Sequence, residues 1–151
     1  MISRGTAAST SDGLCVPSTL VDAGIIIAAL NVRDRYHEAA ADLLGSYTGV
    51  LLTTWPAIAE TCALVPRRRQ AQVLEWVRVT AARIVSIDEG VEFMQDYMAK
   101  YDDLPCDFAD ASLVYAAMRT GVREIWTLDS DFLVYRMPDR TRFKVIPGGK
   151  S

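Results

Sequence analysis

Four acidic residues that lie far apart in the chain occupy comparable places in its pattern: Asp22, Glu60, Asp110 and Asp129. Asp22 and Asp129 each directly follow a run of apolar residues, and the other two lie near the beginning of segments with helical periodicity. Oxygen ligands without histidine or cysteine favour hard cations such as Mg²⁺ or Mn²⁺. Such an ion polarises a phosphoryl oxygen and lowers the pKa of a water bound to it. These residue types therefore indicate metal-dependent hydrolysis of a phosphodiester.

The elements that must position these acids follow from the alternation of short apolar runs with longer amphipathic segments, which is typical of an α/β domain. Five runs rich in Val, Ile and Leu are predicted to be strands covered on both faces, at 19–21, 50–53, 84–87, 125–128 and 144–146. Six helices are predicted between them, at 24–32, 34–44, 54–65, 67–81, 88–101 and 107–121. Thr54, Asp88 and Asp107 are predicted to cap three of these helices.

This order of elements predicts that the four acids meet. In a parallel sheet with crossover helices, strands end and helices begin at the same edge, where open α/β sheets usually bind ligands. Carboxylates crowded into a partly dry pocket repel one another unless a cation compensates their charge. We therefore expect a metal site at the carboxyl edge of the sheet.

Three segments of the chain resemble the PIN-domain nucleases, in particular the VapC-like toxins of type II toxin–antitoxin pairs. The segments are Leu-Val-Asp-Ala-Gly at 20–24, Ala-Ile-Ala-Glu-Thr at 57–61, and Asp-Phe-Ala-Asp-Ala-Ser-Leu at 107–113 with Thr-Leu-Asp-Ser-Asp-Phe at 127–132. The resemblance implies a three-layer α/β/α fold with a central parallel sheet, cleavage of RNA with Mg²⁺ or Mn²⁺, a homodimer and inhibition by a small antitoxin protein. It also implies that Asp22, Glu60, Asp110 and Asp129 are the catalytic and metal-binding residues.

Two features depart from the family pattern. Family members usually begin almost at the first strand, whereas this chain has an additional arm of about fifteen residues. Many members also carry a hydroxyl or amide residue soon after the first aspartate, where Ala23 and Gly24 stand here. The departures leave the Asp22 ligand in place and remove side-chain support from the two positions after it.

Several site residues have structural alternatives. Asp22 could be only an N-cap, and Asp107 competes with Asp110 because residues three apart share a helix face. We expect Asp107 to be a helix cap or an accessory acid. Asp131 is expected to be a cap or an accessory ligand beside Asp129. Thr127 is expected to form a hydrogen bond within the site, although a strand threonine buried in the core would fit the pattern almost as well.

The residues after the first predicted strand also bear on two alternative functions, a phosphatase and a non-catalytic binding module. A phosphatase of the haloacid-dehalogenase kind also opens with an aspartate after a strand, but it needs a second aspartate where Gly24 stands. A non-catalytic PIN-like module that binds RNA or a partner is the alternative that remains. If an antitoxin binds, Tyr36, Leu43, Leu44 and Trp76 are candidates for the wall of its groove, and for Leu43 and Trp76 a place in the core is an equal alternative.

Composition bounds these hypotheses without deciding between them. The 151 residues suit one domain, which we place at 16–147 after an N-terminal arm at 1–15 and before a tail at 148–151. No apolar run is long enough for a membrane span or a signal peptide, and three dispersed cysteines predict reduced thiols in the cytoplasm. The net charge of −3 becomes about +1 when four metal-binding acids are set aside. Most of the bases are arginine, which suits phosphate, although a GC-rich genome would give the same bias.

Overall fold

A five-stranded parallel sheet lies at the centre of the computed structural model, which describes residues 16–147. The strands are β1 Ser18–Val21, β2 Val50–Thr53, β3 Arg83–Ile84, β4 Glu124–Trp126 and β5 Lys144–Ile146, in the order β3-β2-β1-β4-β5. Every paired neighbour in this sheet is parallel, so all carboxyl ends share one edge. The arm at 1–15, the tail at 148–151 and Cys15 lie outside the described residues.

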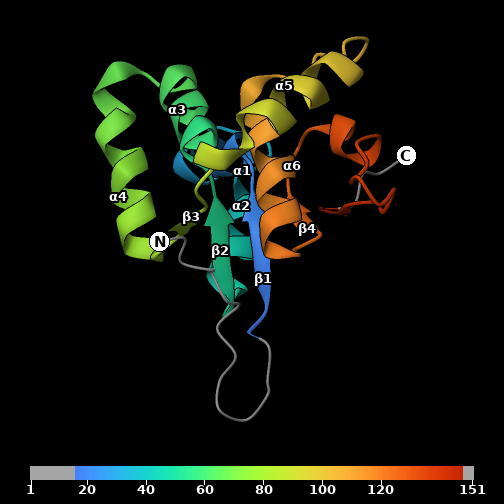
Figure 1. The fold of residues 1–151 in the computed structure, drawn as a ribbon. Helices are drawn as coiled ribbons and strands as arrows, with labels where there is room; N and C mark the ends of the chain where they lie inside the picture. Colours follow the sequence, from blue (N-terminus) through green and yellow to red (C-terminus); the bar gives the residue numbers. More distant parts are fainter. Residues whose placement is uncertain (1–15, 148–151) are drawn as a thin grey trace.

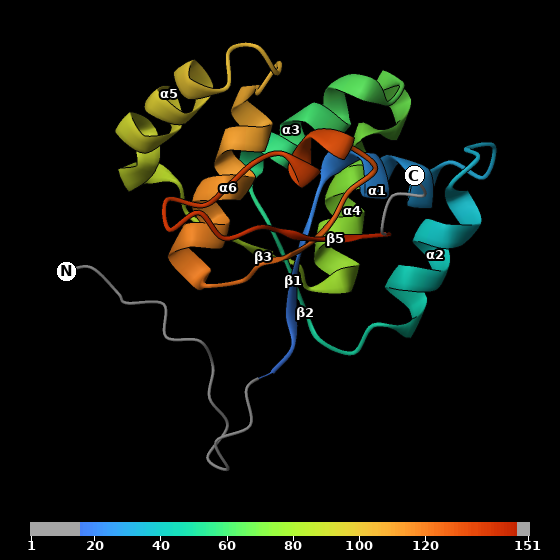
Figure 2. The ribbon, with the colours of Figure 1, turned by 90° about the vertical axis from the view of Figure 1, so that its right-hand side faces the viewer.

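Helices cover both faces of this sheet (Figures 1 and 2). The helices are α1 Ala23–Leu30, α2 His37–Ser46, α3 Trp55–Leu64, α4 Gln70–Thr80, α5 Val91–Lys100 and α6 Phe108–Thr120, with short 3-10 turns η1 Arg67–Arg69, η2 Asp88–Gly90 and η3 Ser130–Leu133. One apolar cluster joins the sheet to α5 and α6, and a second joins it to α1, α2 and α4. The three-layer α/β/α arrangement with a central parallel sheet is therefore confirmed.

The two apolar clusters follow from the alternation of side chains along each strand. Leu20 packs into the cluster under α6, whereas its neighbour Val21 packs into the cluster under α1. Leu52 and Leu51 divide between the same two clusters. Both faces of the central strands are thus buried, which explains why these strands are nearly continuous apolar runs.

Several predicted boundaries are wrong for identifiable reasons. The third strand is only Arg83–Ile84, because its neighbour β2 ends at Thr53, which is paired with Ile84. The helix predicted at 67–81 is divided into η1 and α4. The helix predicted at 34–44 begins at His37, because the preceding residues form side-chain-stabilised turns.

The cap predicted at Asp88 is also wrong. Asp88 opens the 3-10 turn η2, and no side chain caps α5, whose N-cap position is Gly90. A Cβ at Gly90 would lie 2.7 Å from Cε1 of Tyr115, so the absence of a side chain allows this turn to approach α6 closely. The caps predicted at Thr54 and Asp107 are confirmed, and α6 ends at Gly121 in a left-handed conformation.

The proposed antitoxin groove is partly occupied by the core. Trp76 is only 8% exposed and belongs to the cluster under α1, against which Leu43 and Leu44 pack, so the core alternative is correct for Trp76. Tyr36 is more exposed, at 36%. Among residues 16–147, no helix combines the length and the apolar character that crossing a membrane requires.

Candidate active site

Asp22 is held rigidly where β1 ends and α1 begins. Its backbone N–H donates to the carbonyl of Trp126 at 2.9 Å, so it stands beside the end of β4. Its Oδ1 accepts a hydrogen bond from the N–H of Ala23 at 2.7 Å, and its Oδ2 accepts one from Oγ1 of Thr127 at 2.7 Å. The residue is only 6% exposed. Asp22 is therefore the N-cap of α1, which was the alternative to a metal ligand. It also lies at the carboxyl edge of the sheet, together with the other acids.

Thr127 connects Asp22 to the segment after β4. In addition to donating to Asp22, its hydroxyl accepts a hydrogen bond from the N–H of Asp129 at 2.9 Å. Its side chain is almost fully buried. The hydrogen bond predicted for Thr127 is thus present, and the hydroxyl fixes two parts of the edge relative to one another.

Asp107 and Asp110 divide two tasks at the start of α6. Asp107 is exposed and its Oδ1 caps the helix by accepting from the N–H of Asp110 at 2.8 Å. Asp110 is 6% exposed, and its Oδ2 accepts a hydrogen bond from the hydroxyl of Tyr135 at 3.1 Å. An acid in the first turn also interacts favourably with the helix dipole.

Glu60 reaches the same region from α3. This helix packs against α1 and α6, and the hydroxyls of Thr54 and Ser112 lie 2.6 Å apart in a buried contact between α3 and α6. Thr54 also caps α3. The contact fixes the helix that carries Glu60 against the helix that carries Asp110. Glu60 itself is half-buried.

The segment after β4 differs from the prediction. The strand ends at Trp126, so Asp129 lies three residues beyond it and does not follow it directly. Asp129 is the N-cap of η3, and its Oδ1 accepts from the N–H of Asp131 at 2.9 Å. The cap of this turn is Asp129, because the chain leaves the sheet two residues early, so of the two alternatives for Asp131 the accessory acid is the one that remains. Both acids are half-buried.

The pKa values show that these acids share one electrostatic field. Burial first, and the charges of nearby acids after it, raise the pKa of Asp22 to about 6, of Glu60 to about 7 and of Asp110 to about 8. The acids whose charges act on these three include Asp107 and Asp129. In the described part of the chain, the ion pairs involve Glu75, Asp139 and Glu124, so no ion pair compensates this cluster.

The carboxylate oxygens at this edge are suitable ligands for a hard cation such as Mg²⁺, but they do not stand in the positions of a complete coordination site. Five acids at one edge of the sheet, Asp22, Glu60, Asp107, Asp110 and Asp129, offer carboxylate oxygens of the kind that Mg²⁺ prefers. Across residues 16–147, however, no group of three or more His, Cys, Asp or Glu side chains is close enough together to hold a metal ion as these side chains stand. The structure brings the predicted acids into one field without forming a complete coordination site.

Sequence reasoning predicted the hydrogen bond of Thr127 but missed two other polar contacts that support the acids. Tyr135 donates to Asp110, and the Thr54–Ser112 contact joins two acid-bearing helices. Ser112 stands two residues after Asp110 in a segment that resembles the family, so a weak signal existed for it. Tyr135 gives no such signal, because it lies among aromatic residues that pack against one another.

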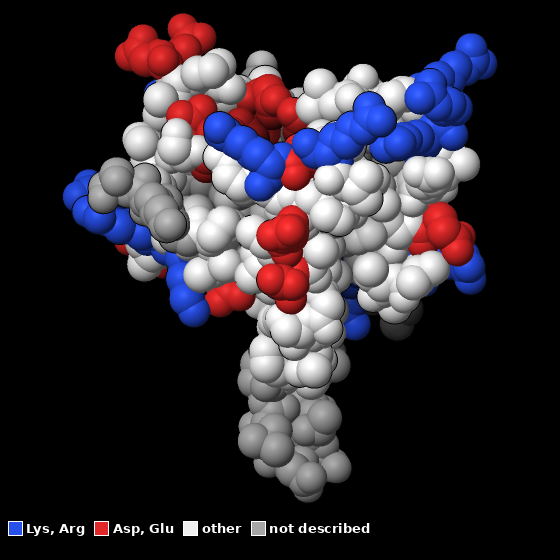
Figure 3. All heavy atoms as spheres, turned by 180° about the vertical axis from the view of Figure 1, so that it is seen from behind, with Lys and Arg blue, Asp and Glu red and all other residues white. Residues whose placement is uncertain are grey.

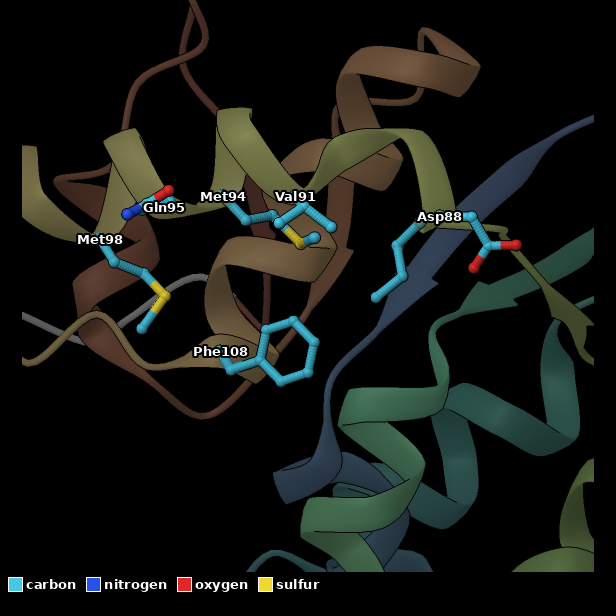
Figure 4. Close-up of a pocket in the computed structure, with 7 residues that line it drawn as sticks. Asp88, Val91, Met94, Gln95, Met98 and Phe108 are labelled. Carbon is cyan, nitrogen blue, oxygen red and sulfur yellow. The ribbon is translucent and has the colours of Figure 1, made fainter.

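An apolar hollow of about 400 Å³ lies beside the acids, between α5 and the start of α6. Figure 4 shows Val91, Met94 and Phe108 close to one another around it, with Met98 at one end. Phe108 follows Asp107 directly and is 52% exposed. The acidic edge therefore borders an apolar surface on its α5 side.

The surface seen from behind shows acidic side chains next to basic side chains (Figure 3). Acidic side chains line a recess near the upper edge of the molecule, and a band of lysine and arginine side chains passes beside the recess. This part of the surface therefore carries charges of both signs side by side.

Comparisons with known proteins agree with this architecture. The family model of the PIN domain matches residues 19–136, which is most of the chain. A solved structure of the Mycobacterium tuberculosis toxin VapC20, a sarcin-ricin loop cleaving toxin, superposes with a TM-score of 0.67. It is 24% identical in sequence and the match covers 75% of this chain and 91% of that one. No curated protein matches the chain. The resemblance inferred from the sequence motifs is confirmed, and the chain belongs to the PIN-domain family.

Proposed function

We propose that the protein is a metal-dependent endoribonuclease that hydrolyses phosphodiester bonds in RNA. The observation that carries this proposal is the group of acids at the carboxyl edge of a PIN fold, where burial and mutual repulsion raise three pKa values and no ion pair within residues 16–147 offsets them. A site that concentrates negative charge in this way is suited to a divalent cation. The likeness to VapC20, a sarcin-ricin loop cleaving toxin, supports RNA as the substrate.

Each acid has a distinct part in this proposal. Asp22, Asp110 and Asp129 hold Mg²⁺ or Mn²⁺, and Glu60 contributes directly or through water. When bound, the ion supplies charge that stabilises the phosphoryl oxygens and makes a water more acidic. Because no three of these side chains within residues 16–147 stand close enough together to hold a metal ion, a closed shell requires side chains to move, and Glu60 and Asp129 are the least buried of the four.

The supporting residues position the acids. Thr127 keeps the Asp22 carboxylate oriented, and Tyr135 does the same for Asp110. Asp107 and Asp131 are accessory acids that add negative charge around them. Water supplies the attacking oxygen, so the products carry a 5′-phosphate and a 3′-hydroxyl.

The test of this proposal is cleavage of end-labelled RNA by the purified protein. We expect cleavage with Mg²⁺ or Mn²⁺, loss of cleavage in EDTA, and recovery when the metal is restored. Undiminished cleavage in EDTA would contradict metal dependence. Products that end in a 2′,3′-cyclic phosphate would show that the RNA 2′-hydroxyl attacks, and would contradict hydrolysis by water. Binding of RNA without cleavage would instead favour the non-catalytic PIN-like module.

We further propose that this nuclease is a cytoplasmic toxin, acts as a homodimer and is inhibited by a small antitoxin protein. The support is the likeness to the toxin VapC20. Expression of the wild type should arrest bacterial growth, and co-expression of a small protein encoded beside it should restore growth. Asp22→Asn, at the same soluble level, should be harmless. Equal growth with the wild type and with Asp22→Asn would remove the support for the toxin role.

A further inference from the structure

The loop between α1 and α2 presents two arginines in a fixed shape. The N–H of Arg33 donates to Oδ1 of Asn31 at 3.2 Å, and the N–H of Tyr36 donates to Oδ1 of Asp34 at 2.8 Å. Such turns between side chain and backbone stabilise a loop without a helix or sheet. The side chains of Arg33 and Arg35 are exposed on this loop.

Neither arginine is neutralised by an ion pair within residues 16–147. Asp34 stands between them in the sequence, but its carboxylate is engaged by the N–H of Tyr36. The guanidinium of Arg35 lies 4.5 Å from the centre of the Tyr36 ring, which orients it without removing its charge. Both guanidinium groups therefore retain their charge and their hydrogen-bond donors for a ligand.

A second set of arginines follows α3. Arg67 and Arg68 are exposed and Arg69 is half-buried in the turn η1. The amide of Gln70 donates to the carbonyl of Cys62 at 2.9 Å, which ties this turn to α3. None of the ion pairs in the part of the chain that the structure describes involves these three arginines.

Both sets lie a short distance from the acids. Asp22 caps α1, and this eight-residue helix spans roughly 12 Å before the loop that carries Arg33 and Arg35. Glu60 lies in the second half of α3, close before η1. Figure 3 shows basic side chains in a band beside the acidic recess. The unneutralised arginines thus follow the two helices that carry Asp22 and Glu60, whose own charges would repel a polyanion.

We propose that Arg33, Arg35, Arg67 and Arg68, here called the arginine track, bind the phosphates of an RNA strand and guide it across the acidic edge. The inference rests on the proposed function and adds to it the residues that hold the substrate away from the reacting bond. Guanidinium groups match phosphate oxygens with paired donors. An RNA backbone fits the track better than a short acidic protein segment does, because its phosphates repeat along the strand and can reach both sets of arginines at once.

The experiment measures binding of a fluorescent oligouridine by anisotropy, in EDTA, over a series of salt concentrations. The variant Arg33→Ala/Arg35→Ala is compared with Arg83→Ala/Arg119→Ala, which removes the same charge from exposed positions at the start of β3 and the end of α6. Loss of two phosphate contacts should lower the slope of log Kd against log salt by about 1.4 and raise Kd about tenfold. The control variant should bind as the wild type does.

Cleavage kinetics distinguish a failure of the track from a failure of the proposed function. On a long RNA with Mn²⁺, the track variant should have a raised KM and an unchanged kcat, and on a dinucleotide it should match the wild type. If the wild type cleaves RNA and the track variant keeps the wild-type Kd, salt slope and KM, the track is overturned while the nuclease stands. If no variant cleaves, the proposed function fails, and the anisotropy still decides whether the track binds RNA. Unchanged RNA binding together with loss of inhibition by the antitoxin would make the track a protein interface and overturn the inference.

Discussion

The carboxyl groups at the carboxyl edge of the sheet have raised pKa values, whereas those of Glu75 and Asp139 on the outer surface have lowered pKa values. Glu75 accepts a hydrogen bond from Nε of Arg78 at 2.9 Å, and Asp139 accepts from the hydroxyl and the N–H of Thr141. These hydrogen bonds lower the pKa of each outer carboxyl. At the edge, burial and neighbouring acids raise the pKa of Asp22 and of Asp110.

The difference shows that this fold keeps carboxylates without a basic partner at the carboxyl edge of the sheet. On the outer surface each of these acids has a local partner, which is the ordinary way to satisfy a carboxylate. At the edge, the hydrogen bonds that Asp22 and Asp110 accept come from neutral donors, and the arginines stand a helix length away. Such an arrangement costs stability in the isolated protein, because like charges in a partly dry site repel. A bound divalent cation would reverse that cost.

The largest expected effect concerns cleavage. Asp110→Asn should lower kcat/KM at least about 10³-fold, which corresponds to about 4 kcal/mol, because it removes a buried negative charge from the centre of the site. Asp139→Asn is the matched control and should cleave RNA as the wild type does, since Asp139 lies on the outer surface. Steady-state kinetics on one labelled RNA measures both. If both variants lost kcat/KM to a similar extent, the acids at the carboxyl edge would not differ in function from those on the outer surface.

The next effect is on stability in the absence of metal. Because the folded-state pKa values of Asp22, Glu60 and Asp110 lie above their ordinary values, the native state binds more protons than the unfolded state. This contribution to stability is complete below about pH 4 and is lost as the pH rises through about 8. We expect the urea midpoint in EDTA to fall over this range, by a change on the order of 3 kcal/mol in the free energy of unfolding.

Asp110→Asn should flatten this pH dependence, because the group with the highest pKa of the three no longer titrates. Glu75→Gln should leave the fall in place, since Glu75 has a lowered pKa and lies outside the cluster. A midpoint that rises with pH in the wild type would contradict the raised pKa values.

A smaller effect is expected at Thr127. Thr127→Val removes the donor to Oδ2 of Asp22 and leaves a buried carboxylate oxygen without that partner, at a cost of about 1–3 kcal/mol. We expect kcat to fall with little change in KM, because the acid loses its orientation while the arginine track is unaffected. Thr127→Ser should restore most of the rate. A valine variant with wild-type kcat would show that Thr127 is only a core residue.

The smallest effect is expected at Tyr135. Its hydroxyl lowers the pKa of Asp110 by hydrogen bonding, so Tyr135→Phe should raise that pKa further. The acidic limb of the pH–rate profile should then move to higher pH, with a loss of about 1 kcal/mol in transition-state stabilisation near neutral pH. A profile that keeps its position would mean that the Tyr135 hydroxyl does not act on the site.

The sequence was sufficient for the parts of the molecule that depend on local pattern and topology. Apolar runs predicted all five strands, and the parallel order placed Asp22 and Asp110 at one edge because strands end and helices begin there. Thr54 and Asp107 were recognisable as caps from their residue types alone.

The remainder depends on contacts that local pattern does not encode. The partner of Asp110 is Tyr135, twenty-five positions away in the chain, and that of Asp22 is Thr127, one hundred and five positions away. The early end of β4 places Asp129 at the start of a turn, where its side chain accepts from the N–H of Asp131, and a boundary error of two residues was enough to hide this. Packing between distant segments decides these details.

Proton release on metal binding tests most directly whether the acids with raised pKa values form the metal site. Calorimetric titration of the metal-free protein with Mn²⁺, in buffers of different ionisation enthalpy, counts the protons released. Near pH 6.5 we predict release of about one proton or more, because Glu60 and Asp110 have pKa values of about 7 and about 8. Near pH 9 release should fall almost to zero, and Asp110→Asn should release less than the wild type at pH 6.5. Saturable binding without proton release at pH 6.5, or no saturable binding at either pH, would contradict the claim.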